Sequence, residues 1–182
     1  MPDEADAPDD RQPAGGPAED LSVYPAAGAP AEAWELARDP EAAWRKPPPG
    51  RLIGKGHPTG DFLEAHEWRI VAERPGYYQL EAHLPSQVRN LRGDLFGGFS
   101  PTYVDLLSLR TVVAAREPEA PRGRLVTLSM HVDYFAPVTG PHFLLECEVR
   151  HRRGKNWLVE TRFRNAEGEL LLLAMTTLRD MA

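Results

Sequence analysis

Hydrophobic and polar residues alternate through much of the second half of the chain, a pattern typical of half-buried β-strands. Arg74-Pro75-Gly76 and Asn165-Ala166-Glu167-Gly168 are turn signals that separate neighbouring stretches. The predicted strands are 67–73, 77–84, 125–134, 143–152, 157–164 and 170–178. In the third of these, His131 is expected to point away from the core. The residues expected on its core face are Leu128, Met130, Val132 and Tyr134.

A single long helix is expected between the second and third of these strands. Ser100-Pro101 supplies a helix N-cap followed by a proline at the first helical position, and apolar residues continue to about Ala115. Nearly every face of this helix is apolar, so we expect protein to surround it. The order of elements indicates an α+β fold, in which an antiparallel sheet wraps around one long central helix.

The beginning of the chain differs in composition from the rest. The first 60 residues hold 11 of the 18 prolines, and 11 acidic against 6 basic residues. Because such a segment has little to bury and cannot offset its ordering entropy, we expect 1–50 to be disordered or loosely docked. The folded domain is then 51–182. Asp39-Pro40-Glu41 is a helix-start signal, and Trp34 and Trp44 could dock this segment on the domain or recruit a partner.

Charge and cysteine content exclude several classes of function. The chain has 27 acidic and 21 basic residues, a net charge of −6, which argues against a protein that binds nucleic-acid phosphates. A single cysteine, Cys147, rules out a disulfide framework, and its place on an apolar strand face predicts a core residue. No apolar run is long enough to span a membrane, and the first residues lack the apolar stretch of a signal peptide. We therefore expect a cytoplasmic protein.

The candidate chemistry lies where a glycine-rich loop meets the predicted helix. Gly97-Gly98 stands where backbone N–H groups have no intrahelical partner and could polarise a carbonyl, although the glycines could also only permit a tight turn. Asp105 is a carboxylate among apolar helix residues, which suits a general base or nucleophile unless it lies on a wet stripe of the helix. Asn90 could position water or a carbonyl, but a loop asparagine more often bonds its own backbone. The six histidines show no metal-ligand spacing, so we expect structural or surface roles for them and no bound metal.

The stretch from Asn90 to Gly98, followed after six residues by Asp105, resembles the signature of hotdog-fold acyl-CoA thioesterases of the PaaI-like group. In that family an asparagine and a glycine precede a His-Gly-Gly sequence, and an aspartate or glutamate follows on the central helix. The stretch 125–137, which ends in an aromatic residue and a proline, is similar to a strand of the same family. The resemblance covers about residues 64–178 and implies the hotdog fold.

The resemblance implies a role for individual residues. Asp105 corresponds to the catalytic carboxylate, which acts as nucleophile or general base towards the thioester. Gly97 corresponds to the residue whose backbone N–H polarises the thioester carbonyl, and Asn90 to the residue that orients the water or the carboxylate. Thr127 corresponds to a Ser or Thr that helps to hold the water. Family sites form between two subunits, so a homodimer is implied, in which Asp105 faces the other chain's loop, and two dimers often form a homotetramer.

One position departs from the family pattern, because Phe96 stands where the family has a histidine and has no conventional hydrogen-bonding group. The basic cluster His151-Arg152-Arg153-Gly154-Lys155 lies at a predicted hairpin tip. It is either a solvated turn or a site for the phosphates of coenzyme A. The substrate-binding residues implied are Gly98, Phe96, Tyr103, Arg153, Gly154 and Lys155.

The expected function is hydrolysis of an acyl-CoA to a free acid and coenzyme A, with no metal or organic cofactor. One alternative is an acyl-CoA or acyl-carrier binding protein with little or no catalysis, which Phe96 favours and Asp105 opposes. Another is a hotdog enoyl-CoA hydratase, whose motif holds an aspartate and a histidine a few residues apart. Here no histidine follows Asp105 before His131. The chain has neither a G-x-S-x-G nucleophile elbow nor a P-loop.

Overall fold

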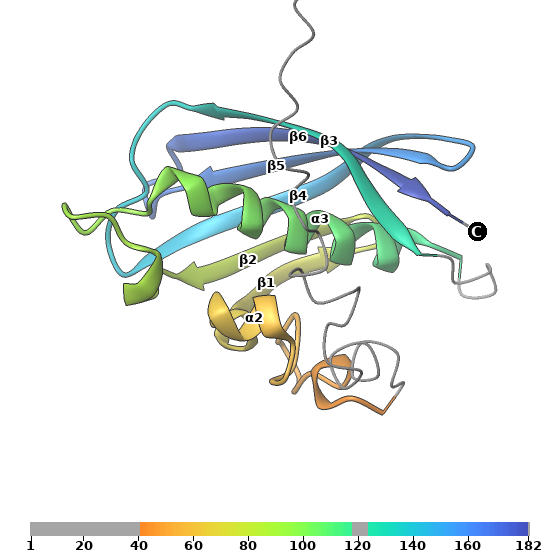
Figure 1. Cartoon of the computed structure of the whole chain (residues 1–182), viewed down its shortest axis with the longest axis horizontal. Coiled ribbons are helices and arrows are strands. Elements are labelled where there is room, and N and C mark those ends of the chain that lie inside the picture. The colour runs from red at the N-terminus through yellow and green to blue at the C-terminus, as the bar shows by residue number, and fades with distance from the viewer. Residues whose placement is uncertain (1–40, 118–123, 182) are drawn as a thin grey trace, which may run out of the picture. The chain divides into compact units, whose positions relative to one another are not determined.

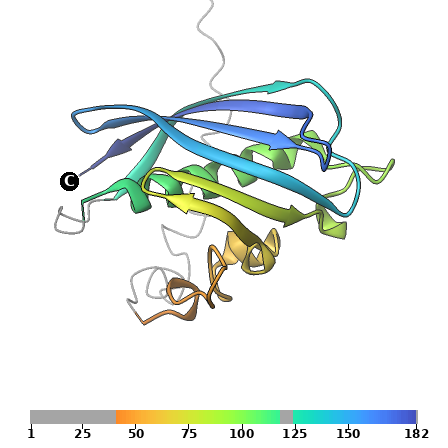
Figure 2. The same ribbon diagram turned by 180° about the vertical axis from the view of Figure 1, so that it is seen from behind.

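The computed structural model describes residues 41–117 and 124–181. In these residues one long helix lies across one face of a six-stranded antiparallel sheet (Figures 1 and 2). The helices are α2 (Pro58–Phe62) and α3 (Ser100–Ala115), with 3-10 turns η2 (Ala43–Arg45), η3 (Ala65–Glu67), η4 (Ser86–Val88) and η5 (Gly97–Phe99). The strands are β1 (Arg69–Arg74), β2 (Tyr77–His83), β3 (Leu125–Tyr134), β4 (His142–Arg153), β5 (Asn156–Arg164) and β6 (Leu170–Asp180).

The order of strands in the sheet is β1-β2-β4-β5-β6-β3, and every neighbouring pair is antiparallel. The two predicted hairpin turns hold glycines with positive φ, 75° at Gly76 and 86° at Gly168, a conformation that costs glycine little. All six predicted strands, the helix and the α+β arrangement are confirmed, with small differences at the ends of elements. The edge strands are β1 and β3, each of which pairs with one neighbour.

Aromatic rings between the helix and the sheet form the centre of the core. Tyr103 of α3 is fully buried and stacks on Trp68, with 5.3 Å between ring centroids. Its ring also meets Phe143 and Phe163 edge-on, from β4 and β5. As predicted, Cys147 is a buried core residue, and burial raises the pKa of its thiol. Such packing explains why α3 needs apolar side chains on more than one face.

The segment 41–68 packs against this core before the first strand begins. Ile53, Leu63 and Trp68 are fully buried. A Cβ atom at Gly54 would lie 2.3 Å from the backbone oxygen of Ala43, so only glycine fits this close approach. The helix-start signal at Asp39-Pro40-Glu41 lies outside the described residues except for Glu41, as do Trp34 and all the rest of 1–40. Between residues 41 and 50, the described chain contains a single helical element, the 3-10 turn η2.

Two details of the predicted elements are wrong. The N-cap of α3 is Phe99, and Ser100 is already helical without a side-chain cap, because the 3-10 turn η5 runs directly into the helix. On β3 the side chains of Leu128 and Tyr134 are each 54% exposed instead of facing the core. The reason is that β3 is an edge strand whose register shifts between Thr127 and Ser129. His131 points outward as expected.

None of the helices in the described part of the chain combines the length and the apolarity that crossing a lipid bilayer requires.

Candidate active site

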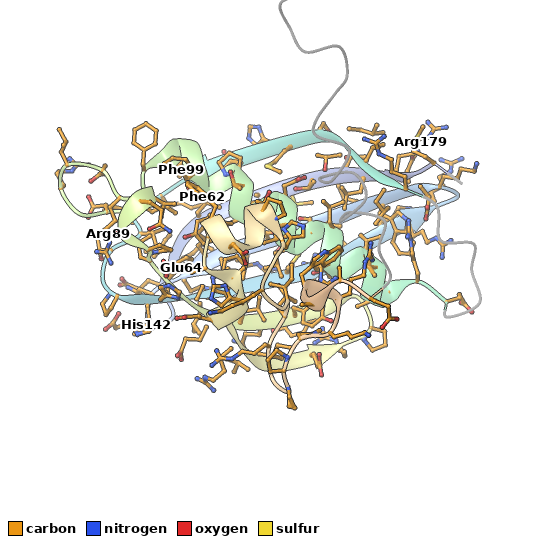
Figure 3. All side chains as sticks on the ribbon, turned by 60° about the horizontal axis from the view of Figure 1, so that its bottom comes forward. Phe62, Glu64, Arg89, Phe99, His142 and Arg179 are labelled. Atoms are coloured by element: carbon orange, nitrogen blue, oxygen red, sulfur yellow. The ribbon has the colours of Figure 1, made fainter. Side chains whose placement is uncertain are left out.

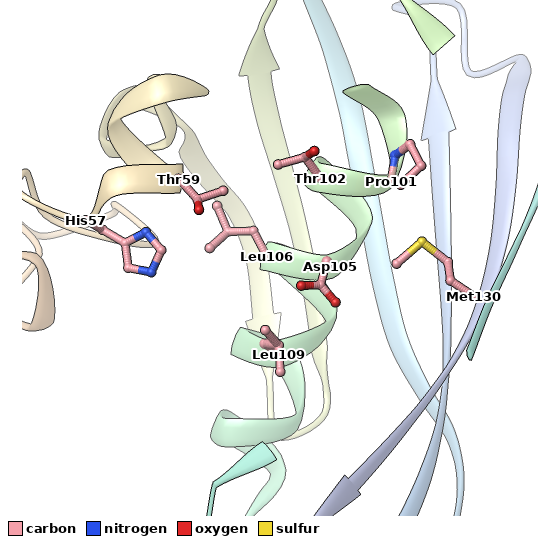
Figure 4. Close-up of a pocket in the computed structure, with 8 residues that line it drawn as sticks. All are labelled: His57, Thr59, Pro101, Thr102, Asp105, Leu106, Leu109 and Met130. Carbon is pink, nitrogen blue, oxygen red and sulfur yellow. The ribbon is translucent and has the colours of Figure 1, made fainter. Parts of the chain in front are cut away.

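A pocket of about 510 Å³ lies between α2, residues 101–109 of α3, and β3 (Figure 4). Its walls are mostly apolar, and Asp105 of α3 is the only carboxylate among the residues that line it. The lining residues are His57, Thr59, Pro101, Thr102, Asp105, Leu106, Leu109 and Met130. A concave, largely apolar pocket with few polar groups is the usual form of a small-molecule site.

The carboxylate of Asp105 is half-buried and held in place from the neighbouring strand. The hydroxyl of Thr127 donates a hydrogen bond of 2.5 Å to its Oδ1 atom. Thr127 stands at the register shift of β3, which turns its side chain towards the helix. The structure therefore brings together two of the four predicted catalytic residues, although 22 positions separate them in the sequence.

The loop before α3 is anchored at several backbone positions. The N–H of Phe96 bonds the carbonyl of Val88 at 2.8 Å, and the N–H of Leu95 bonds that of Val138 at 2.9 Å. The hydroxyl of Tyr134 donates to the carbonyl of Gly97 at 2.9 Å. Because Gly97 begins the turn that leads into α3, its N–H has no intrahelical acceptor. The loop thus presents a fixed backbone donor at the positive end of the helix dipole.

The ring of Phe96 covers the second glycine of this loop. A Cβ atom at Gly98 would lie 2.8 Å from the Phe96 ring, so a side chain at this position would displace the ring. Phe96 is 52% exposed and meets Phe99 edge-on, with 5.8 Å between centroids. The phenylalanine therefore stands next to the predicted donor and leaves half of its surface open.

The side chain of Asn90 shapes the same loop. Its Oδ1 accepts hydrogen bonds from the N–H groups of Arg92, at 2.8 Å, and Asp94, at 3.1 Å. This is the local backbone bonding that is common for loop asparagines. Neither Asn90 nor Gly97 lines the pocket beside Asp105 of the same chain.

The predicted substrate-binding residues lie in three different places. Gly98 and Phe96 belong to the loop before α3, whereas Tyr103 is at the centre of the core and does not line the pocket. Burial raises the pKa of Tyr103, and its hydroxyl has no hydrogen-bond partner among the described residues. Arg153, Gly154 and Lys155 form the exposed β4–β5 turn, in which Gly154 has a φ of 58°.

Comparisons with known proteins agree with this architecture. The family model of the thioesterase superfamily matches residues 92–172. The sheet that curves around one helix is shared with solved structures of thioesterases. The chain therefore has the hotdog fold, and residues 92–172 are similar to the thioesterase superfamily. No curated protein sequence matches it.

Three solved structures illustrate the likeness of this hotdog domain. A thioesterase family protein from Silicibacter pomeroyi is 20% identical, with a TM-score of 0.58 over 68% of this chain and 88% of its own. A phenylacetic acid degradation-related protein from Ralstonia eutropha is 17% identical, with a TM-score of 0.58 over 69% and 92%. A hypothetical thioesterase from Streptococcus pneumoniae, solved with coenzyme A, is 19% identical, with a TM-score of 0.56 over 64% and 90%. At these identities the likeness establishes the fold.

The pocket of this hotdog-fold protein contains polar residues that the sequence analysis did not single out. His57 and Thr59 line it, yet both precede the part matched by the family model. His57-Pro58 is an N-cap and first-turn signal that could have predicted α2. No local pattern indicates that α2 packs beside Asp105, because that contact joins segments almost 50 positions apart.

Within residues 41–117 and 124–181, one group of side chains could hold a metal ion. Ligand atoms of Glu64, Glu67 and His83 all lie within 4.8 Å of one another. Glu64 is bonded to His83, and that hydrogen bond is the main reason that the pKa of Glu64 is lowered. Glu64 lies at the same end of the fold as Phe62 and Phe99 (Figure 3). The group is not part of the pocket that holds Asp105.

Proposed function

We propose that the protein hydrolyses acyl-CoA thioesters to a free acid and coenzyme A, with Asp105 as the general base or nucleophile. The observation that carries the proposal is the position of this carboxylate on the wall of a mostly apolar pocket, oriented by the hydroxyl of Thr127. The apolar walls suit an acyl chain, and the carboxylate suits the attack on its carbonyl. The similarity of residues 92–172 to the thioesterase superfamily supports thioester hydrolysis at the level of the family.

The chemistry can follow two routes. As a general base, Asp105 removes a proton from a water molecule whose oxygen attacks the thioester carbonyl. The tetrahedral intermediate then breaks its C–S bond, and the proton held by Asp105 returns to the thiolate of coenzyme A. As a nucleophile, Asp105 attacks the thioester carbonyl, and the C–S bond breaks to release the coenzyme A thiolate, which takes a proton from water. The resulting anhydride is hydrolysed by water to the free acid and the Asp105 carboxylate. In both routes the oxyanion is stabilised by a backbone N–H donor, and no metal or organic cofactor takes part.

The N–H donor in this proposal comes from the second subunit of a homodimer. Asn90 and Gly97 do not line the pocket of their own chain, so the loop that carries them is available to a neighbouring one. The edge strand β3 exposes Leu128 and Tyr134, and α3 exposes Val113. An unpaired strand edge with exposed apolar side chains favours pairing with another chain. The basic turn at Arg153 is the proposed contact for the phosphates of coenzyme A, and two dimers can form a tetramer.

Release of thiol from a panel of aliphatic and aryl acyl-CoAs tests the proposal. We expect turnover by the full chain and a loss of at least about 100-fold in kcat for Asp105→Asn, because general acid–base catalysis contributes about that much. Asp133→Asn, an exposed carboxylate on β3, is the matched control and keeps the native rate. Equal rates for the native chain and a folded Asp105→Asn variant would overturn the assignment of Asp105.

The second candidate function is binding of acyl-CoA without turnover. The observation in its favour is Phe96, an apolar side chain next to the backbone donor at the position where the family has a histidine. Coenzyme A binding by a native chain that releases no thiol from any member of the panel would favour this candidate.

A further inference from the structure

The segment 41–68, which precedes the part matched by the family model, forms one wall of the pocket. It is fixed to the central helix by a hydrogen bond of 2.8 Å from Nη2 of Arg110 to the backbone oxygen of Leu52. The N–H of Gly54 bonds the carbonyl of Trp44 at 3.0 Å and closes the segment on itself. Because its apolar side chains are part of the core, this wall has a defined position relative to α3.

His57 and Thr59 are the polar residues that this wall contributes to the pocket, and the orientation of the His57 ring is fixed. Its Nδ1 accepts a hydrogen bond of 2.9 Å from the N–H of Gly60 and so caps α2. The indole of Trp44 meets the ring edge-on, with 5.1 Å between centroids, which restricts its rotation. Figure 4 shows His57 and Thr59 at one end of the pocket, on the opposite side of Leu106 from Asp105.

The fixed orientation determines what the ring can offer to a ligand. An Nδ1 atom that accepts a hydrogen bond carries no proton, so the neutral ring carries its proton on Nε2. Burial, and next the charge of Arg110, lower the pKa of His57 below its ordinary value of 6.5. The ring is therefore neutral at pH 7 and offers an uncharged N–H. Among the described residues no acceptor is bonded to Nε2.

We infer that His57 is a specificity-determining residue whose Nε2–H binds an oxygen atom of the acyl group several atoms away from the thioester carbonyl. This inference rests on the proposed function for the placement of the carbonyl beside Asp105. Leu106, Leu109 and Met130 line the space around that carboxylate and contact the apolar part of the acyl chain. The substrate class is an acyl-CoA whose chain bears a hydroxyl or carbonyl group at its far end, where the hydroxyl of Thr59 is a second polar contact.

Two substitutions distinguish the role of His57 as a hydrogen-bond donor in the pocket from its role as the N-cap of α2. His57→Asn keeps an acceptor at the position of Nδ1, so the cap on Gly60 is retained and the group that reaches the pocket is lost. His57→Gln places an amide N–H near the position of Nε2 and loses the cap. The matched control is His142→Phe, an exposed histidine at the start of β4.

The measurement is the dissociation constant of acyl-CoAs, determined by calorimetry on the full chain that carries Asp105→Asn, so that binding is read without turnover. The ligands are butanoyl-, hexanoyl- and octanoyl-CoA, each beside its ω-hydroxy derivative. At the chain length that reaches His57, we expect the hydroxyl to improve affinity by about tenfold, a modest value for a polar contact in a buried site. We expect His57→Asn to abolish this preference, and His57→Gln and His142→Phe to retain most of it.

The outcomes are distinct from those of the hydrolysis assay. No preference for the hydroxyl at any chain length, or an equal preference with His57→Asn, would overturn the role of His57 whether or not the native chain hydrolyses the same compounds. A preference lost with His57→Gln and kept with His57→Asn would show that the helix cap matters instead of the donor. If the native chain binds with the expected preference but releases no thiol, the proposed hydrolysis fails and the specificity of the pocket stands.

Discussion

At the residue scale, the hydroxyl of Thr127 orients the carboxylate of Asp105, because it donates a hydrogen bond to one of its oxygens. We expect Thr127→Val to lower kcat by about tenfold, equivalent to about 1.4 kcal/mol, the size of one hydrogen bond to a charged group. Thr127→Ser keeps the hydroxyl and is expected to retain most of the rate. Steady-state kinetics on one acyl-CoA distinguish the variants, and a valine variant with native kcat would contradict this role.

Tyr103 combines complete burial with a hydroxyl that has no hydrogen-bond partner in the described part of the chain. A buried polar group without a partner has lost its hydration without compensation. We expect Tyr103→Phe to raise the free energy of unfolding by about 1 kcal/mol and to leave the KM for acyl-CoA unchanged.

Denaturant unfolding and steady-state kinetics test both statements about Tyr103→Phe. Tyr134→Phe is the contrasting variant, because it removes a hydroxyl that donates a hydrogen bond to the carbonyl of Gly97. The gain in the free energy of unfolding is therefore expected for Tyr103→Phe and not for Tyr134→Phe. A raised KM in Tyr103→Phe would indicate that Tyr103 contacts the substrate, as the family resemblance implies.

At the scale of elements, the short helix α2 depends on the protonation state of its N-cap. His57 accepts from Gly60 through Nδ1, and burial followed by Arg110 lowers its pKa below 6.5, whereas Asp61 acts in the opposite direction. Below pH 6.5 the unfolded chain binds a proton at this position before the folded chain does. The stabilising contribution is thus present above pH 6.5 and is lost as the pH falls through the lowered value.

We therefore expect the thermal midpoint to fall between pH 7.5 and pH 5.5, and to fall less in His57→Asn. The asparagine keeps the cap and does not titrate, so the difference between the two proteins isolates this histidine from the others. Calorimetric scans at equal protein concentration measure it. The same decline in both proteins would place the pH dependence elsewhere.

The long helix and its sheet explain why the site lies where it does. The helix α3 begins at the glycine loop, carries Asp105 in its second turn and packs its buried face on β4 and β5. The same helix therefore presents an anchored donor loop and a carboxylate at one end of the sheet. Its remaining face holds the pocket, which β3 and α2 border (Figure 4).

At the scale of the whole molecule, the two edges of the sheet offer a direct test of the proposed dimer. Each edge strand exposes one large aliphatic side chain, Leu128 on β3 at 54% and Val71 on β1 at 44%. We expect Leu128→Glu to shift the protein towards the monomer of 20.3 kDa, because a charge buried in an interface without a partner is costly. The same variant is expected to lose turnover, since each site needs a loop from the second chain.

Sedimentation and thiol release measured together test this prediction. Val71→Glu is the matched control and is expected to leave both the mass and the rate unchanged. A Leu128→Glu variant that retains its dimeric mass would mean that the chains associate through another surface.

The strands, the central helix and the core position of Cys147 could be predicted from the sequence. Their signals are local, because the periods of two and 3.6 residues and the turn residues act within a few positions of the chain. The loop motif and Asp105 were singled out for the same reason: a glycine pair next to a carboxylate in an apolar helix is visible without knowledge of the fold. The family resemblance then supplied the expected fold, which the structure bears out.

Tertiary structure alone decided which of these residues meet. The contact between Thr127 and Asp105 depends on a register shift in β3, and the position of His57 in the pocket depends on how the segment 41–68 packs on α3. Alternation on β3 predicted a core face, but exposure of Leu128 follows from its place at the edge of the sheet. Tertiary packing determines which distant segments meet and which strand lies at the edge of the sheet. A local stretch of sequence does not specify either, because it does not specify its neighbours in space.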